Sequence, residues 1–245
     1  MIIRPQKGAQ SDLLACPAQE IFYGGARGGG KSHGILLDFA KHAYKHGGHV
    51  NGVLFRRTYP ELEDLQSKAQ RIFPFLGANY KAGVKTWQFQ SGAQLKMRYL
   101  QSEDHVNNYL GHEYTWMGFD QLDAWPKQST VDKLKANLRN PHGIPSRMVA
   151  TGNPAGVGHN WIKARYIDPA PPRTLIRENG SATRCFIPAT VYDNEILMKS
   201  DPDYVSRLKE SGADWLVRAW LYGDWDIVAG GMFDDVWKRD IHIRN

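Results

Sequence analysis

Short apolar runs alternate along the chain with segments whose apolar residues recur at helical spacing. Ile21-Phe22-Tyr23 is an apolar, β-prone run, and residues 33–45 carry apolar side chains at every third or fourth position, so a strand followed by a helix is predicted. The same patterns predict further strands at residues 50–57, 114–119, 147–150 and 184–188, further helices at residues 60–73, 102–110, 131–138, 202–210 and 214–222, and a hairpin of residues 87–89 and 93–100. Strands that alternate with helices indicate an α/β fold with a mostly parallel central sheet flanked by helices.

The pattern changes after residue 168, which indicates a division of the chain. Residues 168–172 read Asp-Pro-Ala-Pro-Pro and cannot continue a helix. We therefore expect residues 1–168 to form the core of the domain. Residues 169–228 would complete it with a small helical lid or linker subdomain, and residues 229–245, which begin with Ala-Gly-Gly, would form a linker.

Composition places the chain among globular proteins. Its 245 residues suffice for one substantial core, 42% of them are hydrophobic, and no window approaches the length of a membrane span. The net charge of +6 is in the direction expected of a protein that meets phosphates. Cys16 and Cys185 lack the spacing of a zinc site or a disulfide framework, so a reducing, cytosolic setting is expected.

The loop between the first predicted strand and helix carries the most specific motif of the chain. It reads Gly25-Ala26-Arg27-Gly28-Gly29-Gly30-Lys31-Ser32, which matches the phosphate-binding pattern G-x-x-x-x-G-K-[ST]. Glycines allow the backbone to direct its N–H groups at an anion, and the helix N-terminus that follows favours negative charge. We therefore expect ATP here, with Lys31 at the β and γ phosphates and the Ser32 hydroxyl at Mg²⁺.

A second nucleotide motif is predicted where the strand at residues 114–119 ends. This strand delivers Asp120 at its carboxyl end, where the carboxylate would orient Mg²⁺. In P-loop ATPases of the additional-strand catalytic-Glu type, the next residue is a Glu that accepts the proton of the attacking water. Here it is Gln121, whose amide can orient water but offers no basic carboxylate at neutral pH. We expect ATP hydrolysis to be very slow or absent, and we expect the turn to point Asp123 away from the site.

Several segments, taken together, follow a known pattern. They are residues 24–32, Phe55-Arg56-Arg57-Thr58-Tyr59, Gly118-Phe119-Asp120-Gln121-Leu122, Leu138-Arg139-Asn140 and Thr151-Gly152-Asn153-Pro154. In order and spacing they resemble the ATPase domain of the large terminase subunits of tailed bacteriophages, over nearly the whole chain. This set is far more specific than the phosphate-binding loop alone.

The resemblance implies an ATPase motor that drives double-stranded DNA into a procapsid. It implies a homo-oligomeric ring, a pentamer in this family, docked on the portal protein. The small terminase subunit would be a further partner, and no membrane would be involved. The protein would act in the host cytoplasm, transiently at the procapsid portal, and would be absent from the mature virion.

The resemblance also assigns roles to particular residues. Arg27 would contact the γ-phosphate in its own subunit, and Arg139 would be a trans finger for a neighbouring subunit or else a solvated residue at a helix end. The segment Thr151-Gly152-Asn153 would couple the state of the γ-phosphate to DNA movement, or form an ordinary polar turn. Gln10 stands where the family places an adenine-reading glutamine, with Gln6 close by as an alternative.

Two features depart from the family pattern. Gln121 replaces Glu, and the C-terminal nuclease domain of full-length terminases is expected to be missing, because Asp234, Asp235 and Asp240 are followed by too little sequence to build it. Three alternatives stay open: a P-loop kinase or phosphotransferase, one lobe of a two-lobed helicase, and a nucleotide-dependent binding module without turnover. The strand end at Thr151 argues against the kinase, and one lobe alone would be inactive as a helicase.

Overall fold

An eight-stranded sheet with the order β3-β4-β5-β2-β6-β7-β1-β8 forms the centre of the computed structural model, which describes residues 3–178, 180 and 182–227. The strands are β1 (Glu20–Gly25), β2 (Asn51–Arg56), β3 (Ala78–Lys81), β4 (Thr86–Phe89), β5 (Gln94–Tyr99), β6 (Trp116–Phe119), β7 (Arg147–Gly152) and β8 (Arg184–Ala189). Neighbours from β5 to β8 pair in parallel, whereas β4 pairs antiparallel with both β3 and β5. The predicted α/β fold with its mostly parallel sheet is confirmed.

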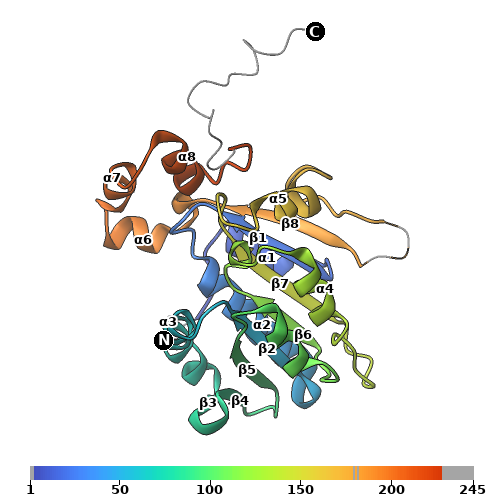
Figure 1. Cartoon of the computed structure of the whole chain (residues 1–245). Helices are drawn as coiled ribbons and strands as arrows, with labels where there is room; N and C mark the ends of the chain where they lie inside the picture. The colour runs from blue at the N-terminus through green and yellow to red at the C-terminus, as the bar shows by residue number, and fades with distance from the viewer. Residues whose placement is uncertain (1–2, 179, 181, 228–245) are drawn as a thin grey trace.

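Helices cover both faces of this sheet (Figure 1). They are α1 (Ala9–Ala15), α2 (Lys31–His46), α3 (Tyr59–Gln70), α4 (Gln128–Lys135), α5 (His159–Ile162), α6 (Glu195–Ser200), α7 (Tyr204–Lys209) and α8 (Asp214–Tyr222). The last three gather at one end of the molecule, at the upper left of Figure 1, and enclose a small apolar cluster that includes Val191, Leu208 and Leu221. These three helices lie within residues 169–228, for which the sequence predicts a small helical subdomain, and that division of the chain stays a prediction. In the part of the chain that is described, no helix has the length and apolar character needed to cross a membrane.

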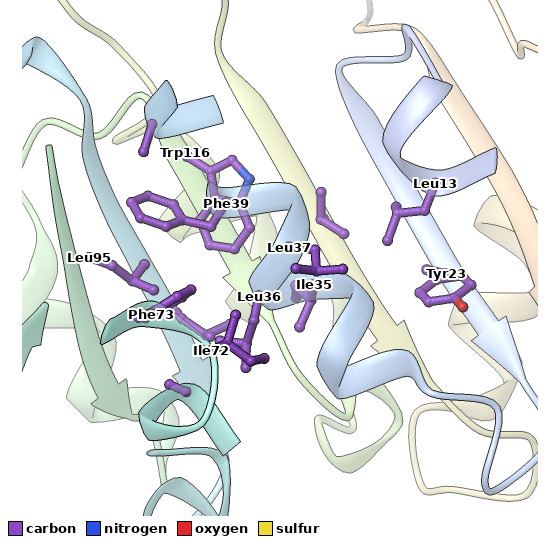
Figure 2. Packing of buried hydrophobic residues seen from close by; sticks show 14 of the residues in the cluster. Leu13, Tyr23, Ile35, Leu36, Leu37, Phe39, Ile72, Phe73, Leu95 and Trp116 are labelled. Carbon is purple, nitrogen blue, oxygen red and sulfur yellow. The ribbon is translucent and has the colours of Figure 1, made fainter. Parts of the chain in front are cut away.

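Buried side chains form one large cluster on each face of the sheet. Successive residues of a strand point to opposite faces. Ile21 and Tyr23 therefore join the cluster beneath α1, α2 and α3, while Phe22 joins the cluster beneath α4 and α5. Figure 2 shows the first cluster, in which Phe39 of α2 packs edge-to-face on Trp116 of β6 with ring centroids 5.2 Å apart. Both faces of β1 are thus held by apolar packing, which fixes the strand that leads into the phosphate-binding loop.

The strand order places the two nucleotide motifs at one edge. Strand β7 lies between β1, which precedes the phosphate-binding loop, and β6, which precedes Asp120. An added strand at this place is the mark of the additional-strand type of P-loop ATPase, as predicted. Because these strands are parallel, their carboxyl ends meet at the same edge, where open α/β sheets bind ligands.

Some elements differ from those predicted. Residues 103–109, expected as an α-helix, form a 3-10 helix (Glu103–Tyr109) whose preceding residue, Ser102, makes no side-chain capping bond. Helices α1, α5 and α6 and strand β3 are short elements that the periodicity does not reveal. The predicted boundary at residue 168 stays a prediction, and β8, beyond it, adds to the core sheet. The predicted linker at residues 229–245 and the aspartates Asp234, Asp235 and Asp240 lie outside the described residues.

Candidate nucleotide-binding site

The phosphate-binding loop runs from the end of β1 at Gly25 to the start of α2 at Lys31. Gly25 has a φ of 132°, and a Cβ there would lie 2.4 Å from the carbonyl oxygen of Ala189 on the neighbouring strand β8. Only glycine fits this close approach of two backbones. The loop therefore leaves the sheet in a path that the first glycine of the motif makes possible.

A cavity of about 900 Å³ opens where this loop faces the ends of β6 and β7. The predicted site residues that line it are Arg27, Gly28, Gly29, Gly30, Lys31, Ser32, Asp120, Gln121, Thr151, Gly152 and Asn153. Glu61 of α3 and Asn194, which precedes α6, also line it and were not predicted. The cavity thus joins the three strand ends that the sequence singles out.

Lys31 lies at the floor of the cavity, folded onto its own loop. Its Nζ donates to the carbonyl oxygens of Ala26 and Gly25, the latter at 3.4 Å. Burial lowers the pKa of Lys31 to about 8, against the opposing influence of the Asp123 and Asp120 carboxylates. Among the residues that the structure describes, no carboxylate forms a salt bridge with this ammonium group, and an anion such as a phosphate would stabilise its charge.

Asp120 is buried at the end of β6 and contacted from three elements. The Ser32 hydroxyl donates to its Oδ2 at 3.1 Å, and the Thr151 hydroxyl donates to its Oδ1 at 2.5 Å. Arg56, from the end of β2, places Nη2 2.8 Å from Oδ2. The Ser32 hydroxyl and the Asp120 carboxylate are the hard oxygen donors that Mg²⁺ prefers, and they lie together beside the phosphate-binding loop, so the donor set fits this ion. Among the described residues no group of three His, Cys, Asp or Glu side chains could hold a metal ion.

Gln121 follows Asp120 in a strained turn. Its φ of 62° lies in the left-handed region, and its N–H donates to the Thr151 hydroxyl at 3.1 Å. A short 3-10 helix (Leu122–Ala124) comes next and returns Asp123 to the cavity wall. The expectation that the turn points Asp123 elsewhere is therefore wrong. The reason is the tight turn, since a 3-10 helix completes a revolution in about three residues.

Comparison with known proteins identifies the family. A family model described as the terminase large subunit, T4likevirus-type, N-terminal, matches residues 22–239. This chain belongs to that family. No curated protein sequence matches it.

Solved terminase structures share the fold. The large terminase of a thermophilic bacteriophage, in complex with ADP, is 19% identical, with a TM-score of 0.72 over 96% of this chain and 57% of that one. The large terminase ATPase domain of Thermus phage P74-26 is 15% identical, with a TM-score of 0.62 over 92% of this chain and 94% of that one. A chain of the bacteriophage Phi-29 genome packaging motor assembly is 16% identical, with a TM-score of 0.55 over 89% of this chain and 68% of that one. The present chain therefore spans little more than half of the ADP-bound large terminase but nearly all of the P74-26 ATPase domain.

The two arginines that the terminase resemblance singles out lie in different surroundings. Arg27 lines the cavity, and its guanidinium carbon lies 3.5 Å from the centre of the Trp220 ring on α8. The backbone N–H of Arg27 donates to the Trp220 carbonyl at 2.7 Å. Arg139 is more than half exposed, and its Nε lies 3.6 Å from a Glu113 carboxylate oxygen. It is not among the described residues that line the cavity. Arg139 is thus placed on the surface of this terminase domain, and its action in trans stays a prediction.

Gln10 lies beneath the phosphate-binding loop of the terminase domain. Its side chain is 2% exposed, its Nε2 donates to the Gly30 carbonyl at 3.0 Å, and its Oε1 accepts from the Gln6 N–H at 2.9 Å. The amide nitrogen therefore braces the loop while the amide oxygen bonds to the segment before α1, and adenine recognition by Gln10 stays a prediction. Asn194 has a similar role from the other side, since its Nδ2 donates to the Gly28 carbonyl at 2.6 Å. The sequence signal for Asn194 is an asparagine just before a helix, where it also caps the Leu197 N–H.

Proposed function

We propose that this chain is the ATPase motor domain of a phage DNA-packaging terminase. The observation that carries the proposal is the meeting, in one cavity, of the phosphate-binding loop, Asp120 and the Thr151 strand end. Membership of the terminase large subunit family supports it, as does the similarity in fold to proteins solved with ADP, with ATP-γ-S and in a packaging motor assembly.

ATP would occupy the cavity with its phosphates at the loop. Lys31 would leave the carbonyl groups of its own loop and bind the β and γ phosphates. Ser32 and Asp120 would hold Mg²⁺, which supplies neutralisation of the charge on those phosphates when bound. Arg27 would add a second positive group from the same loop.

The coupling segment Thr151-Gly152-Asn153 would report the state of the γ-phosphate. Thr151 bonds at once to the Asp120 carboxylate and to the Gln121 N–H, so it joins the end of β7 to the turn after β6. A change in the ligands of Asp120 would reach β7 through this hydroxyl. Movement of double-stranded DNA would follow from that change, in a homo-oligomeric ring in which Arg139 completes the neighbouring site.

The assembly would form on the portal protein of a procapsid in the host cytoplasm. The small terminase subunit would be a further partner, and the ring would be a pentamer. These assignments rest on the family, and they extend the proposal from the ATPase domain to the complete motor.

Gln121 would make this ATPase slow. An amide holds water by hydrogen bonds but does not accept its proton at neutral pH, and general-base catalysis contributes about 10²-fold to 10⁴-fold in rate. The domain would therefore bind ATP readily and hydrolyse it at a small fraction of the rate of a terminase with Glu at this position.

The test is phosphate release from Mg-ATP by the chain and by Gln121→Glu, each with and without linear double-stranded DNA. We expect Gln121→Glu to be at least about 10²-fold faster, and DNA to stimulate it. Gln94→Glu is the matched control, because Gln94 is an exposed residue of β5 outside the cavity lining. Equal turnover by the chain and Gln121→Glu would contradict the role of Gln121. Phosphorylation of a small acceptor without any effect of DNA would favour the kinase.

A further inference from the structure

A second carboxylate reaches the cavity from the turn that follows β6. Asp123 lies in the 3-10 helix Leu122–Ala124 and lines the cavity together with Lys31 and Gln121. The position is set by the backbone, because the turn closes with the Ala124 N–H donating to the Gln121 carbonyl at 3.0 Å. Asp123 is thus presented to the same space as the residue that normally carries the catalytic carboxylate.

The Asp123 carboxylate accepts a hydrogen bond at one oxygen, and among the described residues no donor reaches the other. Its Oδ1 accepts from the Asn153 N–H at 3.0 Å, and its backbone carbonyl accepts from the Gly158 N–H at 2.9 Å. Its Oδ2 has no hydrogen-bond donor among the residues that the structure describes. A Cβ on Gly156 would lie 2.6 Å from that oxygen, so the space around it depends on glycine. One oxygen therefore orients the group while the lone pairs of the other remain for a water.

A catalytic Glu both orients the attacking water and accepts its proton, and here these two properties lie on different residues, Gln121 and Asp123. Gln121 stands next to Asp120 in sequence but has no basic oxygen. Asp123 has the carboxylate, and the 3-10 turn brings it back to the cavity wall. The amide of Gln121 can hold a water, and a carboxylate at the same cavity can accept its proton.

We propose that Asp123 is the general base for the residual ATP hydrolysis of this domain, with Gln121 orienting the attacking water. The proposal rests on the ATPase function proposed above. In the step, the water oxygen forms a bond to the γ-phosphorus, and the bond from that phosphorus to the β–γ bridging oxygen breaks. ADP leaves with the electron pair of that bond, and the water proton passes to Asp123 Oδ2.

The protonation behaviour of Asp123 suits this task. Burial raises its pKa to about 6, although the Asn153 N–H and the charge of Lys31 act against the rise, and the nearby Asp120 carboxylate adds to it. A general base is most effective when its pKa lies near the working pH. An Asp with an ordinary pKa would accept a proton less readily.

The experiment compares phosphate release by four proteins: the unchanged chain, Asp123→Asn, Gln121→Glu and the double variant with both changes. Asn keeps an oxygen that can accept the Asn153 N–H, so the turn is retained while the basic oxygen is lost. We expect Asp123→Asn to lower the residual turnover by about 10²-fold or more, with the Kd for ATP and the melting temperature unchanged. We expect the double variant to turn over like Gln121→Glu, because Glu at position 121 then supplies the base. Asp132→Asn, on the outer helix α4, is the control for loss of an acidic side chain.

The outcomes separate the two proposals. If Asp123→Asn turns over as fast as the unchanged chain, Asp123 is not the base. If the double variant stays slow while Gln121→Glu is fast, Asp123 only braces the turn at Asn153, and the assignment is overturned. No turnover from the unchanged chain beside an active Gln121→Glu also overturns it, and leaves the ATPase function standing. If no variant releases phosphate, with or without DNA, the ATPase function itself is rejected.

Discussion

At the amino end of the sheet buried carboxylates are paired within the chain, whereas at the carboxyl end they face a cavity. Glu20, the first residue of β1, bonds to Lys135 of α4, to Arg165 and to the Tyr166 hydroxyl. Asp120, near the other end of the same sheet, shares its charge with Arg56 but opens onto the cavity beside Lys31 and Asp123. Buried carboxylates therefore have two uses in one sheet: at the amino end they join helices to strands, and at the carboxyl end they line the candidate nucleotide-binding site.

Asp38 repeats the closed arrangement at the amino end. It lies on α2, accepts from the Nε of Arg147 at the start of β7 at 2.9 Å, and accepts from the Trp116 Nε1 at 2.9 Å. Arg147 goes on to donate to the carbonyls of Cys16 and Ala18 ahead of β1. Such pairs tie helices to strands and give each of these carboxylates a counter-ion within the chain. Burial of a carboxylate therefore does not by itself mark a functional site in this fold. A buried carboxylate that lines the same cavity as the phosphate-binding loop, as Asp120 does, is the stronger indication.

The largest effect should come from removing the Lys31 cation at the carboxyl end of the sheet. We expect Lys31→Ala, made in the faster Gln121→Glu protein, to lower kcat/KM for ATP by roughly 10³-fold, because the charge placed at the β and γ phosphates is lost. Steady-state phosphate release measures this. Lys45→Ala, in the last turn of the same helix and exposed, is the matched control and should leave the rate unchanged. A rate that survives Lys31→Ala would remove the phosphate-binding role.

The next largest effect should be on stability, at the amino end of the sheet, where the buried carboxylates are paired. We expect Glu20→Gln to lower the free energy of unfolding by about 3 kcal/mol, because Lys135 and Arg165 lose their buried counter-ion. Burial opposes ionisation of Glu20, but the bonds and charges of Arg165 and Lys135 outweigh it and lower its pKa to about 2. A carboxyl whose pKa falls on folding stabilises the fold above its unfolded pKa of about 4.5, and this contribution is lost as pH falls toward 2.

Denaturant unfolding of both proteins at pH 7 and at pH 3 checks this. The difference between them should be largest at pH 7 and should shrink at pH 3. Asp64→Asn, which breaks an exposed pair with Lys68 on α3, should change stability little. A Glu20→Gln protein as stable as the unchanged chain at pH 7 would show that the closed end contributes nothing to stability.

The smallest effect is a pH dependence at the open end. In the free domain the pKa of Asp123 is raised to about 6 by burial and that of Lys31 is lowered to about 8 by burial. The active form needs Asp123 deprotonated and Lys31 protonated, so kcat/KM should rise with pH through about 6 and fall above about 8. Below the first limit the loss should approach about tenfold per pH unit. The double variant Asp123→Asn with Gln121→Glu provides the comparison, and an identical lower limb there would assign that limb to another group.

Much of the fold could be predicted from the sequence because its signals are local. The apolar run at residues 21–23, the helix after it and the hairpin of β4 and β5 each follow from periodicity within a few residues. The short elements could not be predicted in this way, because seven residues of α1 or six of α6 carry too few apolar positions to set a period. Tertiary packing, rather than local preference, stabilises them.

The candidate site likewise has parts that local sequence signals predict and parts that depend on tertiary structure. The phosphate-binding loop and Asp120 are contiguous with their strands, so their meeting follows from a parallel sheet. The pairing of Arg56 with Asp120 depends on β2 lying next to β6, which no local pattern states. The direction of Asp123 depends on whether three residues form a 3-10 turn or an extended strand end, and the extended alternative gave the wrong expectation. The role of Arg139 depends on a neighbouring subunit, so neither the sequence nor a single chain decides it.

The backbone of Gln121 carries a consequence for how this position evolves. A residue with a side chain in the left-handed region costs about 1–2 kcal/mol, which glycine avoids. Gln121→Gly is therefore the change that selection for stability alone would choose. Selection for turnover would reject it, because the amide that holds the water would be lost. At position 121 selection for stability and selection for turnover therefore favour different residues. A glutamine or glutamate retained there across descendants would indicate that selection for turnover was the stronger.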